Sequence, residues 1–129
     1  NRMMKLERPM DVMHIHVAYF PIPSNLGEMK SKPAQMSIQE LDQHCIHPDI
    51  VLARAEVPVD DVRLDKLEKY SFIKHGNVIP APDEDCIYDI PINFDKFNIG
   101  EKILKTLNLR GERNDLLKEW EKNTKKIKK

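Results

Sequence analysis

Short apolar runs alternate along this chain with segments of helical periodicity, and this alternation limits the folds open to it. Residues 13–20, 50–53 and 77–81 are rich in β-branched or aromatic side chains and are predicted to be strands. The second run, Ile50-Val51-Leu52-Ala53, is apolar throughout, as in parallel strands covered on both faces. Helices are predicted between the strands, over residues 38–44 and 60–71. This order predicts an α/β fold with a parallel sheet and right-handed crossovers.

The two predicted helices have expected inner faces. The first is expected to bury a stripe of three residues, Ile38, Leu41 and Cys45. The second is expected to start at a cap formed by Asp60 or Asp61. Its buried residues are predicted to be Val62, Leu67 and Tyr70. Pro80 has no backbone donor, so the third strand is expected to be short or near a sheet edge.

The chain after Asp83 is predicted to be helical. We expect a helical turn at Ile87 and Tyr88, a helix over residues 99–107, and an amphipathic helix over residues 114–123 after a break at Gly111. Residues 122–129 include five lysines and no acidic residue, and they are expected to form a flexible, solvated tail. A length of 129 residues fits one domain.

A lysine pair before a proline is the strongest candidate for a binding site. Lys30 and Lys32 precede Pro33, and a proline favours extended backbone at the residue before it, so both lysines are expected to point to one side. Ser37 and Glu40 have the spacing of a capping box, which predicts a helix start beside the pair. Two ammonium groups next to a helix N-terminus suit a polyphosphate or another anion. A solvated loop without a ligand is the alternative.

The charged candidates follow the ends of the predicted strands. The lysine pair follows the first strand, Arg54 ends the second, and the acidic run 83–85 follows the third. Because ligands of open parallel sheets bind beyond the carboxyl ends of the strands, a nucleotide-type site is expected at this rim.

Other chemically suggestive residues have ordinary interpretations. His14 and His16 are expected to be packed, hydrogen-bonded strand histidines rather than a metal pair, because no further ligand lies near them in sequence. Cys45 and Cys86 are expected to be small buried hydrophobic residues rather than nucleophiles. The acidic run 83–85 could hold magnesium, but residues of this kind before a helix ordinarily cap it.

The composition excludes several classes of function. Lys plus Arg and Asp plus Glu each number 21, so no overall field attracts nucleic acid or an anionic membrane, and neither partner is expected. With four glycines, the sequence has no G-x-x-x-x-G-K-[ST] loop, and it has no G-x-S-x-G or H-E-x-x-H motif. Two cysteines without metal-type spacing favour a reducing, cytoplasmic location. No catalytic or metal-binding residue is assigned.

Three ordered stretches resemble CTP synthases. They are Lys30-Ser31-Lys32-Pro33-Ala34-Gln35, His47-Pro48-Asp49-Ile50-Val51 followed by Arg54, and Asp83 to Pro91. The similarity covers residues 13–107 and corresponds to the later part of the family's amidoligase (synthetase) domain. It implies that residues 1–109 are part of the parallel sheet of a P-loop-NTPase-like (Rossmann-like) domain with C-terminal helices. Residues 110–129 would form a helical linker towards a glutaminase domain that is missing here.

The resemblance also implies an activity. The family aminates UTP to CTP: ATP phosphorylates the uracil oxygen, and ammonia, free or released from glutamine, displaces the phosphate. The complete enzyme is an ATP- and Mg²⁺-dependent homotetramer. This segment alone is expected to be inactive, because the family's phosphate loop, magnesium ligands and glutaminase triad are not in it. The alternatives are a stand-alone pyrimidine-nucleotide-binding or assembly module without catalysis, and a generic α/β interaction domain.

The resemblance assigns binding residues by position. Those for UTP or CTP are Lys30, Ser31, Lys32, Pro33, Ala34, Gln35 and Lys66, and in the family the lysine motif reaches its nucleotide across a subunit interface. Those for ATP are Arg54, Pro82, Asp83 and Glu84. This chain departs from the family at Ala34, where threonine is usual, at Met36, and at Glu84, where an apolar residue is typical. By helical position alone, Lys66 would be a solvated surface residue.

A sheet taken from a larger one leaves a strand edge and an apolar face uncovered. The isolated chain is therefore predicted to self-associate or to be poorly soluble.

Overall fold

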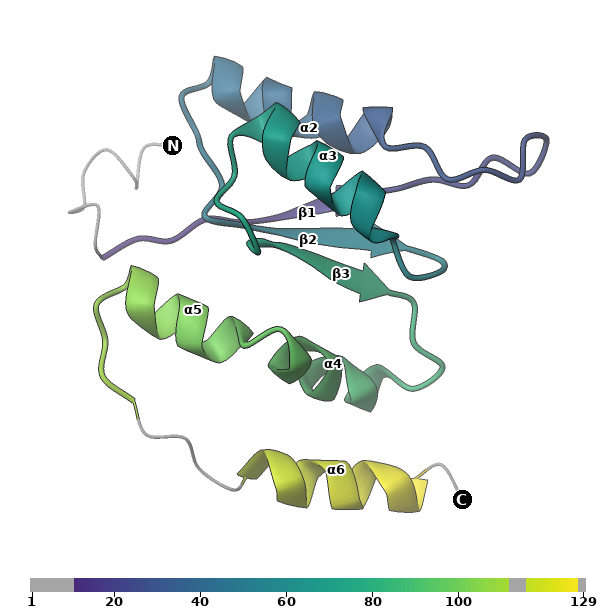
Figure 1. Cartoon of the computed structure of the whole chain (residues 1–129). Coiled ribbons are helices and arrows are strands. Elements are labelled where there is room, and N and C mark those ends of the chain that lie inside the picture. The colour runs from purple at the N-terminus through teal and green to yellow at the C-terminus, as the bar shows by residue number, and fades with distance from the viewer. Residues whose placement is uncertain (1–10, 112–115, 128–129) are drawn as a thin grey trace. The chain divides into compact units, whose positions relative to one another are not determined.

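The computed structural model describes residues 11–111 and 116–127, in two compact units divided between Asp83 and Glu84. The first unit contains β1 (Ile15–Tyr19), α2 (Lys32–Gln43), β2 (Ile50–Ala55), α3 (Asp61–Ser71) and β3 (Val78–Pro82). The three strands are parallel, in the order β1-β2-β3, and α2 and α3 lie over the same face of the sheet (Figure 1). The predicted α/β fold with a parallel sheet is confirmed.

The core of the first unit lies between this face and the two helices. Alternate residues along the strands face inwards: Ala18 of β1 and Phe20 directly after it, Val51, Ala53 and Ala55 of β2, and Val78 of β3. Ile38 of α2 and Leu67 of α3 cover them, and neither side chain is exposed at all. α2 contacts β1 and α3 contacts β3, so each crossover helix holds one side of the sheet.

Both outer strands show the features expected of edges. Pro80 lies in β3, opposite Ala53, and β3 is an edge strand, as the missing backbone donor predicts. At the other edge, Ile15, Val17 and Tyr19 of β1 are 37%, 56% and 49% exposed. They alternate with the residues that face α2, so they lie on the opposite face of the sheet. In the described part of the chain, no strand pairs with the outer side of β1.

α3 begins where it was predicted to begin, but one side of it was predicted wrongly. The Asp60 side chain accepts a hydrogen bond from the backbone N–H of Arg63 at 2.9 Å, which confirms the cap. Val62 and Tyr70, predicted to be buried, are 77% and 57% exposed. Leu64 and Leu67 are three residues apart and so lie on one face of the helix. This face, and not that of Val62 and Tyr70, is turned towards the core.

The start of α2 differs from the prediction. The helix begins at Lys32, with Ser31 as its N-cap at φ −85° and ψ −19°, so the lysine pair does not lie on an extended segment. Ser37 lies inside the helix and donates its hydroxyl to the carbonyl of Ala34 at 2.8 Å, so the predicted capping box is wrong. Pro33 is tolerated because the first turn of a helix needs no backbone donor at that position.

Cys45 follows α2 and is not part of its buried stripe. Its backbone has φ 55° and its side chain is exposed, so its predicted burial is wrong. Leu41 is half-buried, and the buried residues of this helix are Ala34, Gln35 and Ile38.

The second unit is helical. It contains the 3-10 helix η1 (Ile87–Asp89) and the helices α4 (Ile90–Lys96), α5 (Ile99–Thr106) and α6 (Leu116–Ile127). The predicted turn and the helix at residue 99 are confirmed, whereas α4 was not predicted, because Pro91 resembles a helix breaker but lies in the first turn.

The last helix extends further towards the C-terminus than predicted. α6 extends to Ile127, so the part of the lysine-rich tail up to that residue is helical rather than flexible. Asn114, Lys128 and Lys129 lie outside the described residues. Trp120 of α6 donates its indole N–H to the carbonyl of Tyr88 at 2.8 Å, which ties this helix to η1. Among residues 11–111 and 116–127, no helix is both long and apolar enough to cross a membrane.

Candidate functional site: a cationic pocket beyond the sheet

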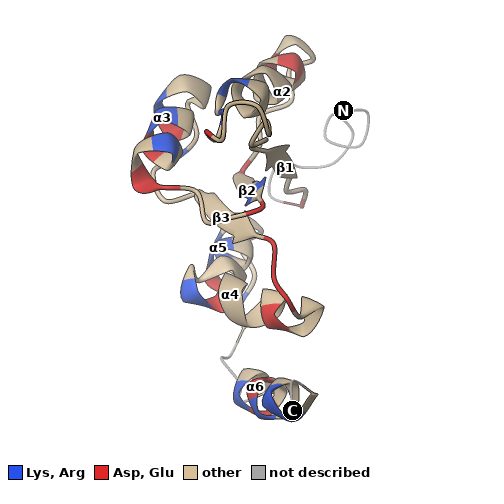
Figure 2. Cartoon of the chain, turned by 90° about the vertical axis from the view of Figure 1, so that its right-hand side faces the viewer, with Lys and Arg blue, Asp and Glu red and all other residues tan. Residues whose placement is uncertain are grey.

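The loops that follow β1 and β2 enclose an open pocket of about 540 Å³, which we call the cationic pocket. Nine residues line it: Glu28, Met29, Lys30, Ser31, Lys32, Asp60, Val62, Arg63 and Lys66. Figure 2 looks along the strands from this end of the sheet and shows charged residues at the starts of α2 and α3. The carboxyl-end rim predicted from the sequence therefore carries a pocket in the first unit.

The pocket contains an excess of positive charge. Four of its lining side chains are cationic and two are acidic. Ser31 caps α2 and Asp60 caps α3, so two helix N-termini open onto the same space. The partial positive charge of helix N-termini adds to that of the side chains. An anion is the ligand that this arrangement suits best.

Lys30, Lys32 and Lys66 were all assigned to a nucleotide from the sequence, and the structure brings them together. Lys30 lies just before α2 and Lys32 is its first residue, whereas Lys66 lies more than one turn inside α3. The packing of α2 against α3 places these elements side by side. Lys66 was assigned by resemblance alone, since its helical position predicted only a solvated side chain.

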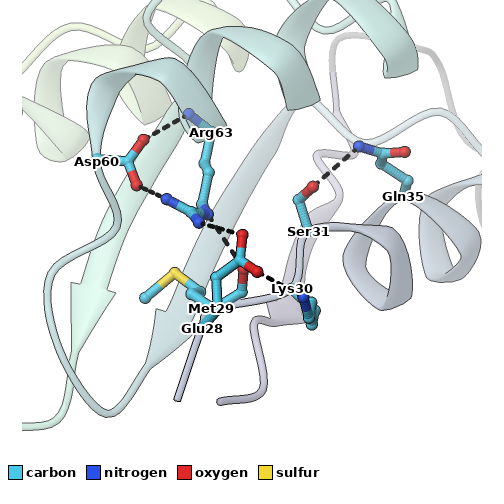
Figure 3. A network of polar contacts seen from close by, with 7 residues as sticks. All are labelled: Glu28, Met29, Lys30, Ser31, Gln35, Asp60 and Arg63. Carbon is cyan, nitrogen blue, oxygen red and sulfur yellow. Dashed lines mark hydrogen bonds and ion pairs between the residues drawn. The ribbon is translucent and has the colours of Figure 1, made fainter. Parts of the chain in front are cut away.

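Arg63 is the cationic residue of the pocket that the sequence analysis did not assign to the site. Its Nε donates to the carbonyl of Met29 at 3.2 Å, one terminal nitrogen bonds the Asp60 carboxylate, and the other lies 3.5 Å from Glu28 Oε1 (Figure 3). It therefore ties the start of α3 to the loop before α2. The sequence signal was present, because Arg63 lies three residues before Lys66 and so shares its helix face.

The two acids of the pocket have lowered pKa values. The hydrogen bond from Lys30, with the charges of Lys30 and Arg63, holds the pKa of Glu28 below its ordinary value. Partial desolvation raises the pKa of Asp60, but hydrogen bonds from Arg63 outweigh it and the net shift is downwards. Both acids are therefore carboxylates at neutral pH.

The rest of the lysine motif does not line the pocket. Pro33 is exposed in the first turn of α2, and Ala34 is fully buried in the core. Gln35 is 8% exposed, and its amide lies 3.4 Å from the hydroxyl of Ser31. Gln35 therefore contacts Ser31, which lines the pocket, as the dashed line in Figure 3 marks.

The residues assigned to ATP form a separate group. Arg54 lies near the end of β2, and its guanidinium pairs with Asp83 at 2.9 Å. The backbone N–H of Asp83 donates to the carbonyl of Ala55 at 2.8 Å, which continues the ladder after Pro82. None of these residues lines the cationic pocket. Glu84 is the first residue of the second unit.

His16 of β1 behaves as the sequence predicted, whereas His14 does not. His14 precedes the strand, and its buried Nδ1 has no hydrogen-bond partner among the described residues, so its expected hydrogen bond is wrong at this atom. The ring of His16 lies 3.0 Å from the Ser37 hydroxyl, which donates its own hydrogen to Ala34, so the imidazole donates this bond. Desolvation, with a smaller effect of His14, lowers the pKa of His16. The interpretation as a packed, hydrogen-bonded strand histidine fits these contacts.

Among the described residues, one group has the geometry of a metal site. It comprises Asp65, Glu68 and His75. Glu68 already accepts bonds from the backbone N–H groups of Gly76 and Val78 at 2.7 and 3.4 Å, and its second oxygen faces His75 at 2.8 Å. These bonds join the end of α3 to β3, so the three residues have a structural role in the turn between the two elements.

The acidic run 83–85 is not part of this group. The 3-10 helix η1 that follows the run has no side-chain cap, so the capping role expected of the run is wrong at this helix.

Comparison with known proteins identifies the family. The family model described as "CTP synthase N-terminus" matches residues 1–109. A CTP synthase of Methanocaldococcus jannaschii is 38% identical over 112 residues, which cover 87% of this chain and 21% of that protein. A CTP synthase of Pyrococcus furiosus is 35% identical over 128 residues, covering 98% of this chain and 24% of that protein.

The chain belongs to the CTP synthase family, as the sequence resemblance indicated. It spans about a fifth to a quarter of the length of the curated relatives that it matches.

Proposed function

We propose that the cationic pocket binds the phosphate tail of UTP, or of CTP as product, within a protein that aminates UTP to CTP. The single observation that carries this proposal is the convergence of Lys30, Lys32 and Lys66 on one pocket. Lysines from two helices give a polyphosphate several charge-assisted bonds at once. Membership of the CTP synthase family supports the choice of nucleotide.

We further propose that Arg54, Pro82, Asp83 and Glu84 contribute to an ATP site. The two side chains pair at 2.9 Å, and the backbone of Asp83 continues the β2–β3 ladder, so Arg54 and Asp83 lie side by side at the strand ends. In this proposal the whole protein uses Mg²⁺, assembles as a homotetramer and contains a glutamine-hydrolysing domain. Positioned phosphates and metal provide phosphoryl transfer, so the residues assigned here bind nucleotide rather than catalyse.

Isothermal titration with UTP and CTP tests the pocket. Because a hydrogen bond to a charged group contributes about 1.5–3 kcal/mol, Lys32→Ala and Lys66→Ala are each expected to raise Kd about tenfold or more. Lys69→Ala is the matched control, since Lys69 is exposed on the same helix but outside the cationic pocket. It is expected to leave Kd within about twofold, like other surface changes away from the site.

Two further titrants separate the proposal from its rivals. Inorganic triphosphate measures the contribution of charge alone, and sulfate measures general anion binding. If UTP and CTP bind no more tightly than sulfate, the chain is an interaction domain and the proposal is wrong. Tight nucleotide binding without CTP formation in the complete protein would instead indicate a binding module. Titration at two chain concentrations shows whether binding requires assembly.

A further inference from the structure

We propose that Glu28 is an internal counter-anion of the cationic pocket, which a phosphate group of the ligand displaces from between Lys30 and Arg63. Arg63 then becomes a ligand-binding residue that family resemblance does not assign. This inference rests on the proposed function, since it concerns the same pocket and the same polyphosphate ligand.

Glu28 bridges two cations with one carboxylate. Its Oε2 accepts a bond from Lys30 Nζ at 2.7 Å, and its Oε1 lies 3.5 Å from a terminal nitrogen of Arg63 (Figure 3). A phosphate group offers the same feature, two anionic oxygens about as far apart, and arginine and lysine bind both kinds of group. Glu28 therefore occupies the position between the cations that a phosphate would take.

Glu28, and not Asp60, is the acid that can leave. Asp60 accepts bonds from the backbone N–H and from the guanidinium of Arg63, and it caps α3. Glu28 contacts its partners through its side chain, which is 63% exposed and flexible. Its release requires only rotation about side-chain bonds, whereas release of Asp60 would uncap a helix.

The loop and Arg63 keep their positions when Glu28 leaves. The backbone N–H of Lys30 donates to the carbonyl of Pro21 at 2.9 Å, and Met29 is buried. Arg63 remains bonded to Asp60 and to the carbonyl of Met29 through two of its three nitrogens. The third nitrogen, now facing Glu28, is then available to the incoming phosphate.

The opposing contribution of Glu28 is modest, because all three partners are partly exposed. Exposed ion pairs are weak, so removal of the competing charge by Glu28→Gln is expected to lower Kd for UTP by roughly two- to fivefold. The same fall in Kd is expected for inorganic triphosphate, because Glu28 competes with phosphate and not with the base. Glutamine keeps the size of the side chain, and a thermal melt verifies that the fold is retained.

The matched control is Glu40→Gln, which removes one negative charge from an exposed position on α2 outside the pocket. It is expected to leave Kd unchanged at 150 mM salt, where distant surface charges are screened. In a second variant, Arg63→Gln is expected to raise Kd about tenfold, through loss of one charge-assisted bond to phosphate.

The outcomes separate this inference from the proposed function. If UTP binds the wild-type chain and Glu28→Gln leaves Kd unchanged or raises it, the inference is wrong and the nucleotide site stands. A gain seen for UTP but not for inorganic triphosphate would also overturn it, since Glu28 would then act at the base. If neither the wild type nor the Glu28→Gln variant binds UTP or triphosphate, the proposed function and the inference are both wrong.

Discussion

The cationic pocket and the Arg54–Asp83 pair lie at the ends of the same parallel strands, but their charges are balanced differently. The pocket is lined by four cationic side chains and only two acidic ones. At the ends of β2 and β3, one guanidinium meets one carboxylate at 2.9 Å, with both side chains more than half exposed. Charged loops are ordinary at this edge of a sheet. An uncompensated excess of one sign is what indicates a ligand, and the cationic pocket shows it whereas the Arg54–Asp83 pair does not.

The largest expected effect is on the free energy of unfolding, and it tests whether α3 is oriented so that it forms one wall of the pocket. Leu67→Ala removes a fully buried side chain from the core-facing side of α3, next to Lys66 in sequence, and should lower the free energy of unfolding by about 2–5 kcal/mol, measured by urea denaturation. Val62→Ala, at a position that is 77% exposed on the same helix, should change it by less than about 0.5 kcal/mol. Equal losses from the two substitutions would mean that α3 is rotated differently and that the pocket lacks this wall.

A smaller effect is expected from the acid that holds Arg63. Asp60→Ala removes the cap of α3 and should cost about 1 kcal/mol of unfolding free energy near neutral pH. Because the pKa of Asp60 is lower in the folded chain, this stabilisation is complete above its ordinary value of 3.8 and is lost as the pH falls through the lowered pKa.

Denaturation of the wild type and the Asp60→Ala variant at several pH values measures this difference. The gap between the two should shrink below about pH 4 and remain constant from pH 5 to 7. A gap that persists in acid would show that Asp60 acts through something other than its charge.

The smallest effect on stability is expected at the Arg54–Asp83 ion pair. Arg54→Ala breaks an exposed ion pair and should lower the free energy of unfolding by less than about 1 kcal/mol. It should leave the Kd for UTP unchanged while weakening ATP binding, both measured by titration. A loss of UTP affinity as large as that of Lys32→Ala would remove the distinction between the two regions.

Features set by neighbours in sequence were predicted well. The apolar run of β2 predicted a covered central strand, and Asp60 caps α3 as its position before the helix predicted. Both follow from local preferences, which do not depend on the rest of the fold. The lysine pair also stood out locally, although its backbone is helical at Lys32 rather than extended.

Features that depend on tertiary packing were predicted poorly. Val62 and Tyr70 have suitable apolar side chains, but the rotation of α3 is set by the sheet beneath it. Ser37 and Glu40 match a capping box, yet Ser37 bonds inside a helix that begins at Lys32, since a proline in the first turn is compatible with that earlier start.

The amino-acid sequence by itself determined the family, the parallel α/β order and the lysine pair, because these depend on residue types and short spacings. Only the tertiary structure placed Arg63 against Met29, 34 positions away, and put Glu28 between two cations. The physical reason is that the packing of α2 and α3 on one sheet face brings distant loops together, and the charge balance of a pocket exists only after that contact forms.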